Sequence, residues 1–231
     1  MKLLAVIPAR GGSKGIPRKN LVPVAGKPLL VWTIEHALAC HAVAHAFVST
    51  DDQEIADVAR RAGAEVPVLR PAELAQDATA TEPVLLHAVQ TYRQRGFDPD
   101  AVMLLQPTSP VRSAGALDRA VEQFARERTD SLLSVCESHA FFWRKSAPPT
   151  ASYDYLNRPR RQDIRAEDRW YRENGSIYIT RTDVLMRTGN RLGGRIALFE
   201  MSEAESYEVD SPTDLLIVDA ILSAQCKRTQ S

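Results

Sequence analysis

The sequence predicts an α/β fold with a doubly wound, mostly parallel sheet. Short, unbroken apolar runs alternate along the chain with segments in which apolar residues recur at helical spacing. Apolar runs without polar alternation are typical of strands buried on both faces, and regular strand–helix alternation implies right-handed crossovers between parallel strands. A length of 231 residues with 44% hydrophobic residues is enough for one domain with an ordinary core.

The expected strands share a core of Val, Ile, Leu and Ala, and they cover residues 3–7, 46–50, 66–69, 101–105, 131–135, 176–180 and 195–201. The expected helices cover residues 29–40, 51–62, 82–95, 113–128 and 212–226. Pro28 suits the first turn of the first helix. Asp51 with Glu54 has the spacing of a capping box, Gly63 stops that helix, and Ser211 caps the last one.

Residues 137–171 interrupt this alternation and carry a concentration of aromatic residues: Phe141, Phe142, Trp143, Tyr153, Tyr155, Trp170 and Tyr171. Disordered linkers are poor in aromatics, so we expect an ordered arm that buries these rings against a partner subunit. The predicted organisation is a single domain over residues 1–231 with an inserted arm at residues 137–171.

Composition excludes several classes of protein. Twenty-nine basic and 29 acidic residues give a formal net charge of +0, so no overall field favours nucleic acid or an acidic membrane. The cysteines, Cys40, Cys136 and Cys226, lie too far apart for a zinc motif or a disulfide framework. The first apolar run ends too early for a signal peptide, and no run has the length of a membrane span. We expect a cytoplasmic protein.

The loop after the first strand, residues 10–20 (hereafter the basic loop), is the strongest candidate site. It has the sequence RGGSKGIPRKN, with four basic residues, three glycines and no carboxylate. Glycines such as Gly11 and Gly12 let backbone N–H groups, including that of Ser13, approach an anion, and clustered cations favour a polyanion such as triphosphate. A solvated basic loop is the alternative. Neither the Walker pattern nor the dinucleotide fingerprint fits this spacing.

Four segments, in chain order, resemble the acylneuraminate cytidylyltransferase family: residues 7–20 (IPARGGSKGIPRKN), 104–110 (LLQPTSP), 171–178 (YRENGSIY) and 209–214 (VDSPTD). The resemblance implies a nucleotidyltransferase, Rossmann-like fold with an inserted dimerisation arm. It also implies transfer of CMP from CTP to the anomeric hydroxyl of a nine-carbon 2-keto-3-deoxy sugar acid, with Mg²⁺ required and pyrophosphate released. The implied assembly is a homodimer, with arm residues acting in trans and with no nucleic-acid or membrane partner.

The resemblance assigns the nucleotide end of the site. Arg10, Lys14 and Lys19 would be catalytic cations that bind the triphosphate. The further residues expected to bind CTP are Gly11, Gly12, Ser13, Asn20, Arg70 and Thr81. Asp210 would hold the magnesium ion, because a hard divalent cation prefers oxygen ligands. Glu208 replaces a second family aspartate, and capping of the last helix is the alternative role for both acids. Arg70 alone could equally be a surface arginine.

The sugar acid would be bound by Gln106, Ser109, Arg161, Arg172 and Asn174, with a bidentate Arg161 on its carboxylate. Three alternatives stay open. One is a cytidylyltransferase for an eight-carbon sugar acid, against which Gln106 counts because that family places an aspartate in the corresponding loop. The others are a non-catalytic nucleotide-binding homologue and an enzyme that uses a nucleotide-sugar donor. The resemblance further implies a sialic or legionaminic acid in place of a pseudaminic acid, because the pseudaminic relatives often have a basic residue at the position of Gly15.

Overall fold

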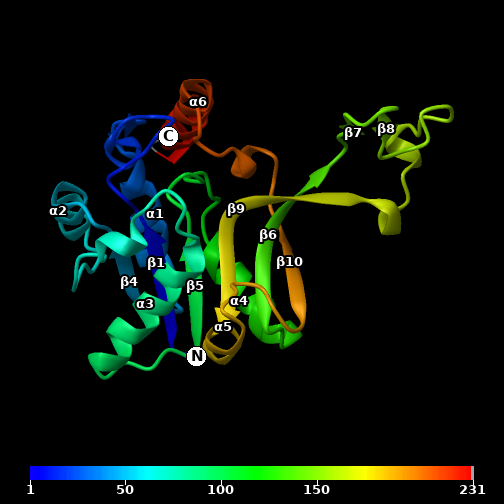
Figure 1. The fold of residues 1–231 in the computed structure, drawn as a ribbon. Coiled ribbons are helices and arrows are strands. Elements are labelled where there is room, and N and C mark those ends of the chain that lie inside the picture. Colours follow the sequence, from blue (N-terminus) through cyan, green and yellow to red (C-terminus); the bar gives the residue numbers. More distant parts are fainter. Residues whose placement is uncertain (230–231) are drawn as a thin grey trace.

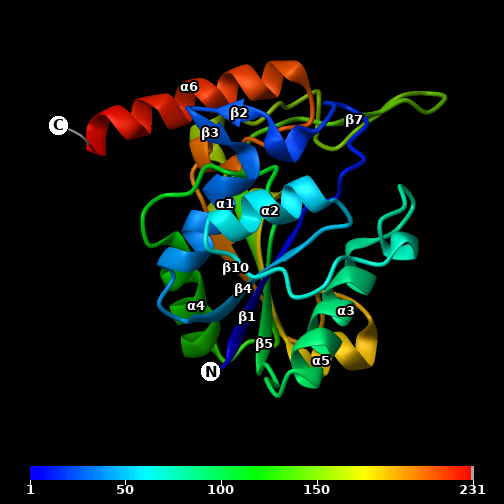
Figure 2. The same cartoon turned by 90° about the vertical axis from the view of Figure 1, so that its left-hand side faces the viewer.

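The computed structural model describes residues 1–229 and has a six-stranded mixed sheet at its centre, with helices on both faces (Figures 1 and 2). The strand order is β10-β6-β9-β5-β1-β4. The strands are β1 (Leu3–Pro8), β4 (Val43–Ser49), β5 (Ala101–Leu105), β6 (Ser131–Ser138), β9 (Trp170–Arg181) and β10 (Ile196–Glu200). This arrangement confirms the predicted α/β class.

One strand runs against the others. β9 is antiparallel to both β5 and β6, whereas the remaining pairs are parallel. The sheet is therefore mostly parallel, as predicted, although strict alternation fails at β9. The reason is local: β9 returns from the arm and not from a crossover helix, so it enters the sheet from the opposite end.

Two layers of helices bury the faces of the sheet. The helices are α1 (Leu29–Ala39), α2 (Gln53–Arg61), α3 (Thr81–Gln94), α4 (Ala116–Glu127), α5 (Thr182–Thr188) and α6 (Pro212–Thr229). Apolar side chains of α1, α2 and α4 pack with one face of the strands, and those of α3 and α5 pack with the other. Helix α6 lies across the carboxyl end of the parallel strands, over the short hairpin of β2 (Pro23–Val24) and β3 (Lys27–Pro28).

Several local features differ from the predictions made from the sequence. Residues 66–69 form no strand, because Pro67 has no N–H to donate to a ladder, and the preceding Glu65 makes an isolated bridge to Phe47. The helix expected from residue 51 begins at Gln53, with Asp52 and not Asp51 as its N-cap, because Asp51 accepts a hydrogen bond from Gly11 N. The sequence also missed α5. The predicted cap of the last helix is confirmed, since Asp214 N donates to Ser211 Oγ at 3.3 Å.

The arm extends from the ends of β6 and β9 away from the sheet (Figure 1). It carries a small hairpin of β7 (Trp143–Arg144) and β8 (Thr150–Ala151), followed by two short 3₁₀ turns. Its aromatic residues pair with one another, as in the contact of Phe141 with Tyr153 at 4.3 Å between ring centroids. Several apolar side chains nevertheless remain exposed, among them Leu156 at 80% and Trp170 at 76%.

Within the described residues, no helix is both long enough and apolar enough to cross a membrane.

Candidate active site

A cavity of about 420 Å³ opens at the carboxyl ends of β1 and β5. This is the edge at which doubly wound sheets bind ligands. Nine of the residues predicted for the site line this cavity: Arg10, Ser13, Lys14, Lys19, Asn20, Arg70, Thr81, Gln106 and Asp210. They come from five separate segments of the chain, so the fold brings together residues up to 200 positions apart.

Two cations of the basic loop share one carboxylate. Arg10 Nη1 lies 2.7 Å from one oxygen of Asp77, and Lys14 Nζ lies 2.6 Å from the other. The hydrogen bond from Lys14, together with the nearby charges, holds the pKa of Asp77 below its usual range. Asp77 thus occupies an anion position between two cations. Sequence reasoning missed Asp77 because it lies in the 70–80 loop, where no motif marks it.

Lys19 and Asp210 also line the cavity and bond to each other. Lys19 Nζ donates to Val209 O at 2.8 Å and to Asp210 Oδ1 at 3.0 Å. The Lys19 side chain is only 16% exposed, whereas that of Asp210 is 70% exposed, so the carboxylate remains accessible to a ligand. Gly15 allows this approach, because a Cβ there would lie 2.6 Å from Asp210 O.

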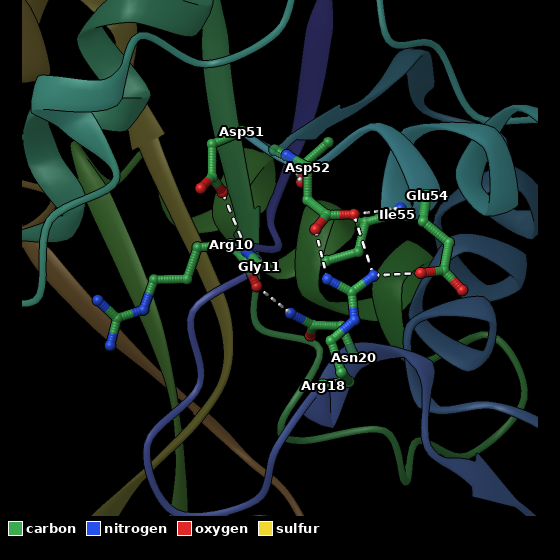
Figure 3. A network of polar contacts seen from close by, with 9 residues as sticks. Arg10, Gly11, Arg18, Asn20, Asp51, Asp52, Glu54 and Ile55 are labelled. Carbon is green, nitrogen blue, oxygen red and sulfur yellow. Dashed lines mark hydrogen bonds and ion pairs between the residues drawn. The ribbon is translucent and has the colours of Figure 1, made fainter.

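A second set of contacts anchors the base of the loop (Figure 3). Asn20 is buried and its Nδ2 donates to Arg10 O at 3.0 Å, and Gly11 N donates to Asp51 Oδ1 at 3.0 Å. The Arg18 guanidinium bonds to the carboxylates of Asp52 and Glu54. Arg18 therefore faces α2, while Arg10 points the other way. The loop itself contains no carboxylate, and distant segments of the chain supply the carboxylates that its cations contact.

Arg70 is buried at 6% exposure, so it is not a surface arginine. Its Nε donates to Ser49 Oγ at 3.0 Å and its Nη2 bonds to Ser49 O, which fixes it at the end of β4. Burial lowers the pKa of Arg70 to about 10, so the side chain stays charged at neutral pH. Thr81 is the first residue of α3 and lines the same cavity.

The turn at Gly175 brings Gln106 and Glu208 together. Gly175 has a φ of +65°, and a Cβ there would lie 2.8 Å from Glu208 Oε1 and 3.3 Å from Gln106 Oε1. Glu208 is held close to Asp210, and its burial together with that charge raises its pKa. Only glycine combines this conformation with this close approach.

A buried polar network supports that turn. β9 places four residues opposite Ser134, between the pairs Leu133↔Tyr178 and Val135↔Glu173. Ser134 Oγ donates to Asn174 Oδ1 at 2.6 Å and accepts from Ile177 N at 2.8 Å, which replaces the missing ladder bonds. Ser109 Oγ donates to Asn174 O at 3.3 Å.

Both Asn174 and Ser109 have no exposed surface, so in this conformation they shape the pocket from behind and do not line it. The network extends to Ser206 Oγ, which accepts from Asn174 Nδ2 at 2.9 Å.

Arg161 and Arg172 line a second cavity, of about 460 Å³, at the base of the arm. Its other residues include Glu137 and Glu200. Arg172 Nη2 donates to Ser206 O at 3.3 Å, whereas Arg161 belongs to a short 3₁₀ turn of the arm. Within one chain, therefore, these two arginines do not line the cavity that holds the basic loop.

The exposed Asp210 carboxylate fits a magnesium ion whose other ligands are mostly water molecules and phosphate oxygens. Within the described residues, no group of three or more His, Cys, Asp or Glu side chains is arranged to hold a metal ion by itself. Magnesium is usually bound in proteins through one or two carboxylates plus substrate phosphates. The exposed Asp210 carboxylate, beside the cations of the basic loop, matches that donor set.

Comparison with known proteins identifies the family. The family model described as "Cytidylyltransferase" matches residues 4–224. This chain belongs to the cytidylyltransferase family. The match spans both the basic loop and Asp210, so the residues that line the cavity all fall within the family domain.

Individual relatives of this chain are named as a synthase of a CMP-linked legionaminic acid or as an N-acylneuraminate cytidylyltransferase. The chain is 36% identical over 228 residues to CMP-N,N'-diacetyllegionaminic acid synthase of Legionella pneumophila, covering 96% of this chain and 97% of the relative. It is 36% identical over 216 residues to N-acylneuraminate cytidylyltransferase A of Danio rerio, covering 91% of this chain but 48% of the relative. The chain therefore spans about half the length of that fish enzyme. These matches confirm the resemblance to the acylneuraminate cytidylyltransferases.

Solved structures support the fold of this cytidylyltransferase. CMP:2-keto-3-deoxy-manno-octonic acid synthetase complexed with CTP matches with a TM-score of 0.73 at 20% identity, covering 97% of this chain and all of that one. A 4-diphosphocytidyl-2C-methyl-D-erythritol synthase matches with a TM-score of 0.69 at 18% identity, covering 96% and 98%. Both likenesses concern the fold alone.

Proposed function

We propose that this protein transfers CMP from CTP to the anomeric hydroxyl of a nine-carbon 2-keto-3-deoxy sugar acid of the sialic or legionaminic type and releases pyrophosphate. The observation that carries this proposal is the single cavity in which Arg10, Lys14 and Lys19 face Asp210 and Gln106. Relatives over nearly the whole chain are named for the same class of reaction.

The proposed mechanism relies on alignment and charge neutralisation. The sugar hydroxyl attacks the α-phosphorus of CTP in line, a new P–O bond forms, and the bond to the leaving pyrophosphate breaks. Arg10 and Lys14 bind the triphosphate after Asp77 gives way, and Lys19 neutralises charge beside Asp210. Asp210, with Glu208 behind it, would hold Mg²⁺, which supplies further charge stabilisation at the phosphates. Asn20, Arg70 and Thr81 orient the nucleoside.

The sugar acid lies between Gln106 and the turn at Gly175 in this proposal. A second copy of the chain covers the arm, which buries the exposed Trp170 and Leu156 and brings Arg161 toward the neighbour's sugar acid. The proposed assembly is thus a homodimer whose arms act in trans. The described cysteines are free thiols, which suits the reducing cytoplasm that we propose as its location.

The decisive assay measures pyrophosphate release from CTP and Mg²⁺ with a panel of sugar acids: N-acetylneuraminic acid, a legionaminic acid, a pseudaminic acid and an eight-carbon acid. We expect turnover with a nine-carbon acid and formation of its CMP derivative. Turnover with the eight-carbon acid alone would replace the proposed substrate class, and CTP binding without turnover on any acid would contradict the proposed catalysis.

A further inference from the structure

The ladder between β5 and β9 stops at the candidate sugar pocket. Its last pair is Leu105↔Ile177, and the next residues on each strand are Gln106 and Ser176. Beyond that pair the strands diverge, since the chain turns into the 106–110 loop on one side and into the left-handed turn at Gly175 on the other. The two backbone carbonyls at this point therefore need another donor.

A buried arginine supplies that donor. Arg112 is 2% exposed, and its Nη2 donates to Ser176 O at 2.9 Å and to Gln106 O at 3.3 Å. Its Nη1 donates to Thr33 Oγ1 of α1 at 3.1 Å. One planar guanidinium thus bridges the two strands where the ladder ends and ties them to the helix beneath. A lysine ammonium lacks this fork of donors.

Arg112 forms no ion pair with its hydrogen-bond partners, because all three acceptors are neutral oxygens. Burial lowers its pKa to about 9, so the guanidinium remains a cation at neutral pH. Within the described residues its Nε has no hydrogen-bond partner. Burial of a cation is unfavourable, and the bonds to the two carbonyls, together with the attraction of the Glu205 carboxylate, offset that penalty.

We propose that Arg112 is a positioning residue that sets the separation of Gln106 from the turn at Gly175, and thereby the width of the sugar-acid pocket. This inference rests on the proposed function. It assigns Arg112 to the sugar acid and not to CTP, because its contacts are to the residues on either side of the sugar pocket. The cations of the basic loop instead bond to Asp77, Asp210 and α2.

The test compares Arg112→Lys and Arg112→Met with wild-type protein. We expect Arg112→Met to raise the KM for the sugar acid about tenfold while the KM for CTP changes less than about twofold, which corresponds to loss of one or two net hydrogen bonds. Arg112→Lys should recover only part of this loss. Tyr92→Phe is the matched control, because it removes a buried hydrogen bond to Glu65 on the α3 side of the sheet. It should lower the melting temperature without separating the two KM values.

Chemical rescue and amide exchange complete the test. Arg112 also lines a separate cavity of about 750 Å³ between α1, α4 and α6, which gives a small cation access to its position. Guanidinium, below denaturing concentrations, should restore sugar-acid KM in Arg112→Ala and leave Tyr92→Phe unchanged. Amide exchange at residues 176–178 should accelerate in Arg112→Met and slow again with guanidinium.

Three results are distinguishable. Equal rises in both KM values, or unchanged exchange at residues 176–178, would overturn the role of Arg112. If the wild-type protein is inactive but its Arg112 variants still show faster exchange at those residues, the proposed function is overturned. The role of Arg112 in bridging the two strands is then still supported. Separation of the two KM values together with rescue supports both.

Discussion

The basic loop and the arm both carry clustered basic residues, but the ion-pair partners of these residues lie at different distances along the sequence. In the loop, Arg10, Arg18 and Lys19 bond to carboxylates that lie 34 or more positions away in the sequence. In the arm, most of the ion pairs are local, such as Arg160 with Asp163 and Arg165 with Asp168, each three residues apart. Arg169 with Glu137 is the longer-range exception among those of the described residues. Distant parts of the fold thus hold the loop, whereas the arm is held mainly by contacts among its own residues.

Apolar burial shows the same difference. The basic loop rests on a core cluster that includes Ile16 and Val209, both nearly inaccessible. The arm leaves Phe142, Trp143 and Trp170 more than half exposed. Exposed aromatic surface of this kind is typical of an interface. The loop is thus packed within a single chain, and the exposed rings of the arm support the proposal that a second chain covers it.

The largest expected effect comes from removing a cation of the loop. Arg10→Ala and Lys19→Ala should each lower turnover about a hundredfold, because loss of one preorganised charge at the phosphates costs roughly 3 kcal/mol of barrier. The measurement is steady-state pyrophosphate release with CTP and the sugar acid. Arg126→Ala, on an exposed face of α4, is the control and should retain full turnover. Near-normal rates in both loop variants would show that the basic loop is not part of the active site.

A smaller effect is expected at the sugar pocket. Gly175→Ala should lower kcat/KM for the sugar acid about tenfold, because the new Cβ would press on Glu208 and Gln106 and shift them. Gly189→Ala has a similar φ, +63°, with nothing within 4 Å of its Cβ. It therefore pays the same backbone cost of about 1 kcal/mol without touching the site. If both variants behave alike in kinetics and melting temperature, the contact at Gly175 has no role in the pocket.

The smallest expected effect concerns Asp77. Its carboxylate, whose pKa the bonds from Lys14 and Arg10 lower, is ionised at neutral pH and competes with triphosphate for these two cations. Asp77→Asn should lower the KM for CTP about two- to threefold, in keeping with the modest strength of exposed ion pairs. The comparison is with Asp98→Asn, which breaks an exposed pair with Arg93 elsewhere. A raised KM for CTP in Asp77→Asn would show that Asp77 assists the nucleotide.

The sequence predicted the parts of the fold that local patterning determines. Runs such as Leu3–Pro8 are apolar throughout because both faces of the sheet are covered. The direction of β9 could not be predicted, because an interior strand has the same apolar pattern whether it runs parallel or antiparallel. Residues 66–69 were wrongly predicted as a strand because the apolar run outweighed the single proline.

The same limit applies to the site. The motifs predicted that the basic loop and Asp210 belong to one site, and both line the same cavity. The bonds from Arg18 to α2 and from Arg112 to two carbonyls depend on how distant segments meet, which no local spacing encodes. Asn174 and Ser109 were predicted to bind substrate, but the structure buries both side chains behind the pocket.

The central claim, that one chain supplies the nucleotide site and its neighbour's arm completes the sugar site, is tested most directly by mixing two inactive variants. Lys19→Ala and Arg161→Ala are each purified, then dissociated and reassociated together. Mixed dimers then contain one site with an intact Lys19 and an intact Arg161 from the partner, so activity should return to about a quarter of wild type. If the arm acts within its own chain, every site in the mixture carries a defect and no activity returns.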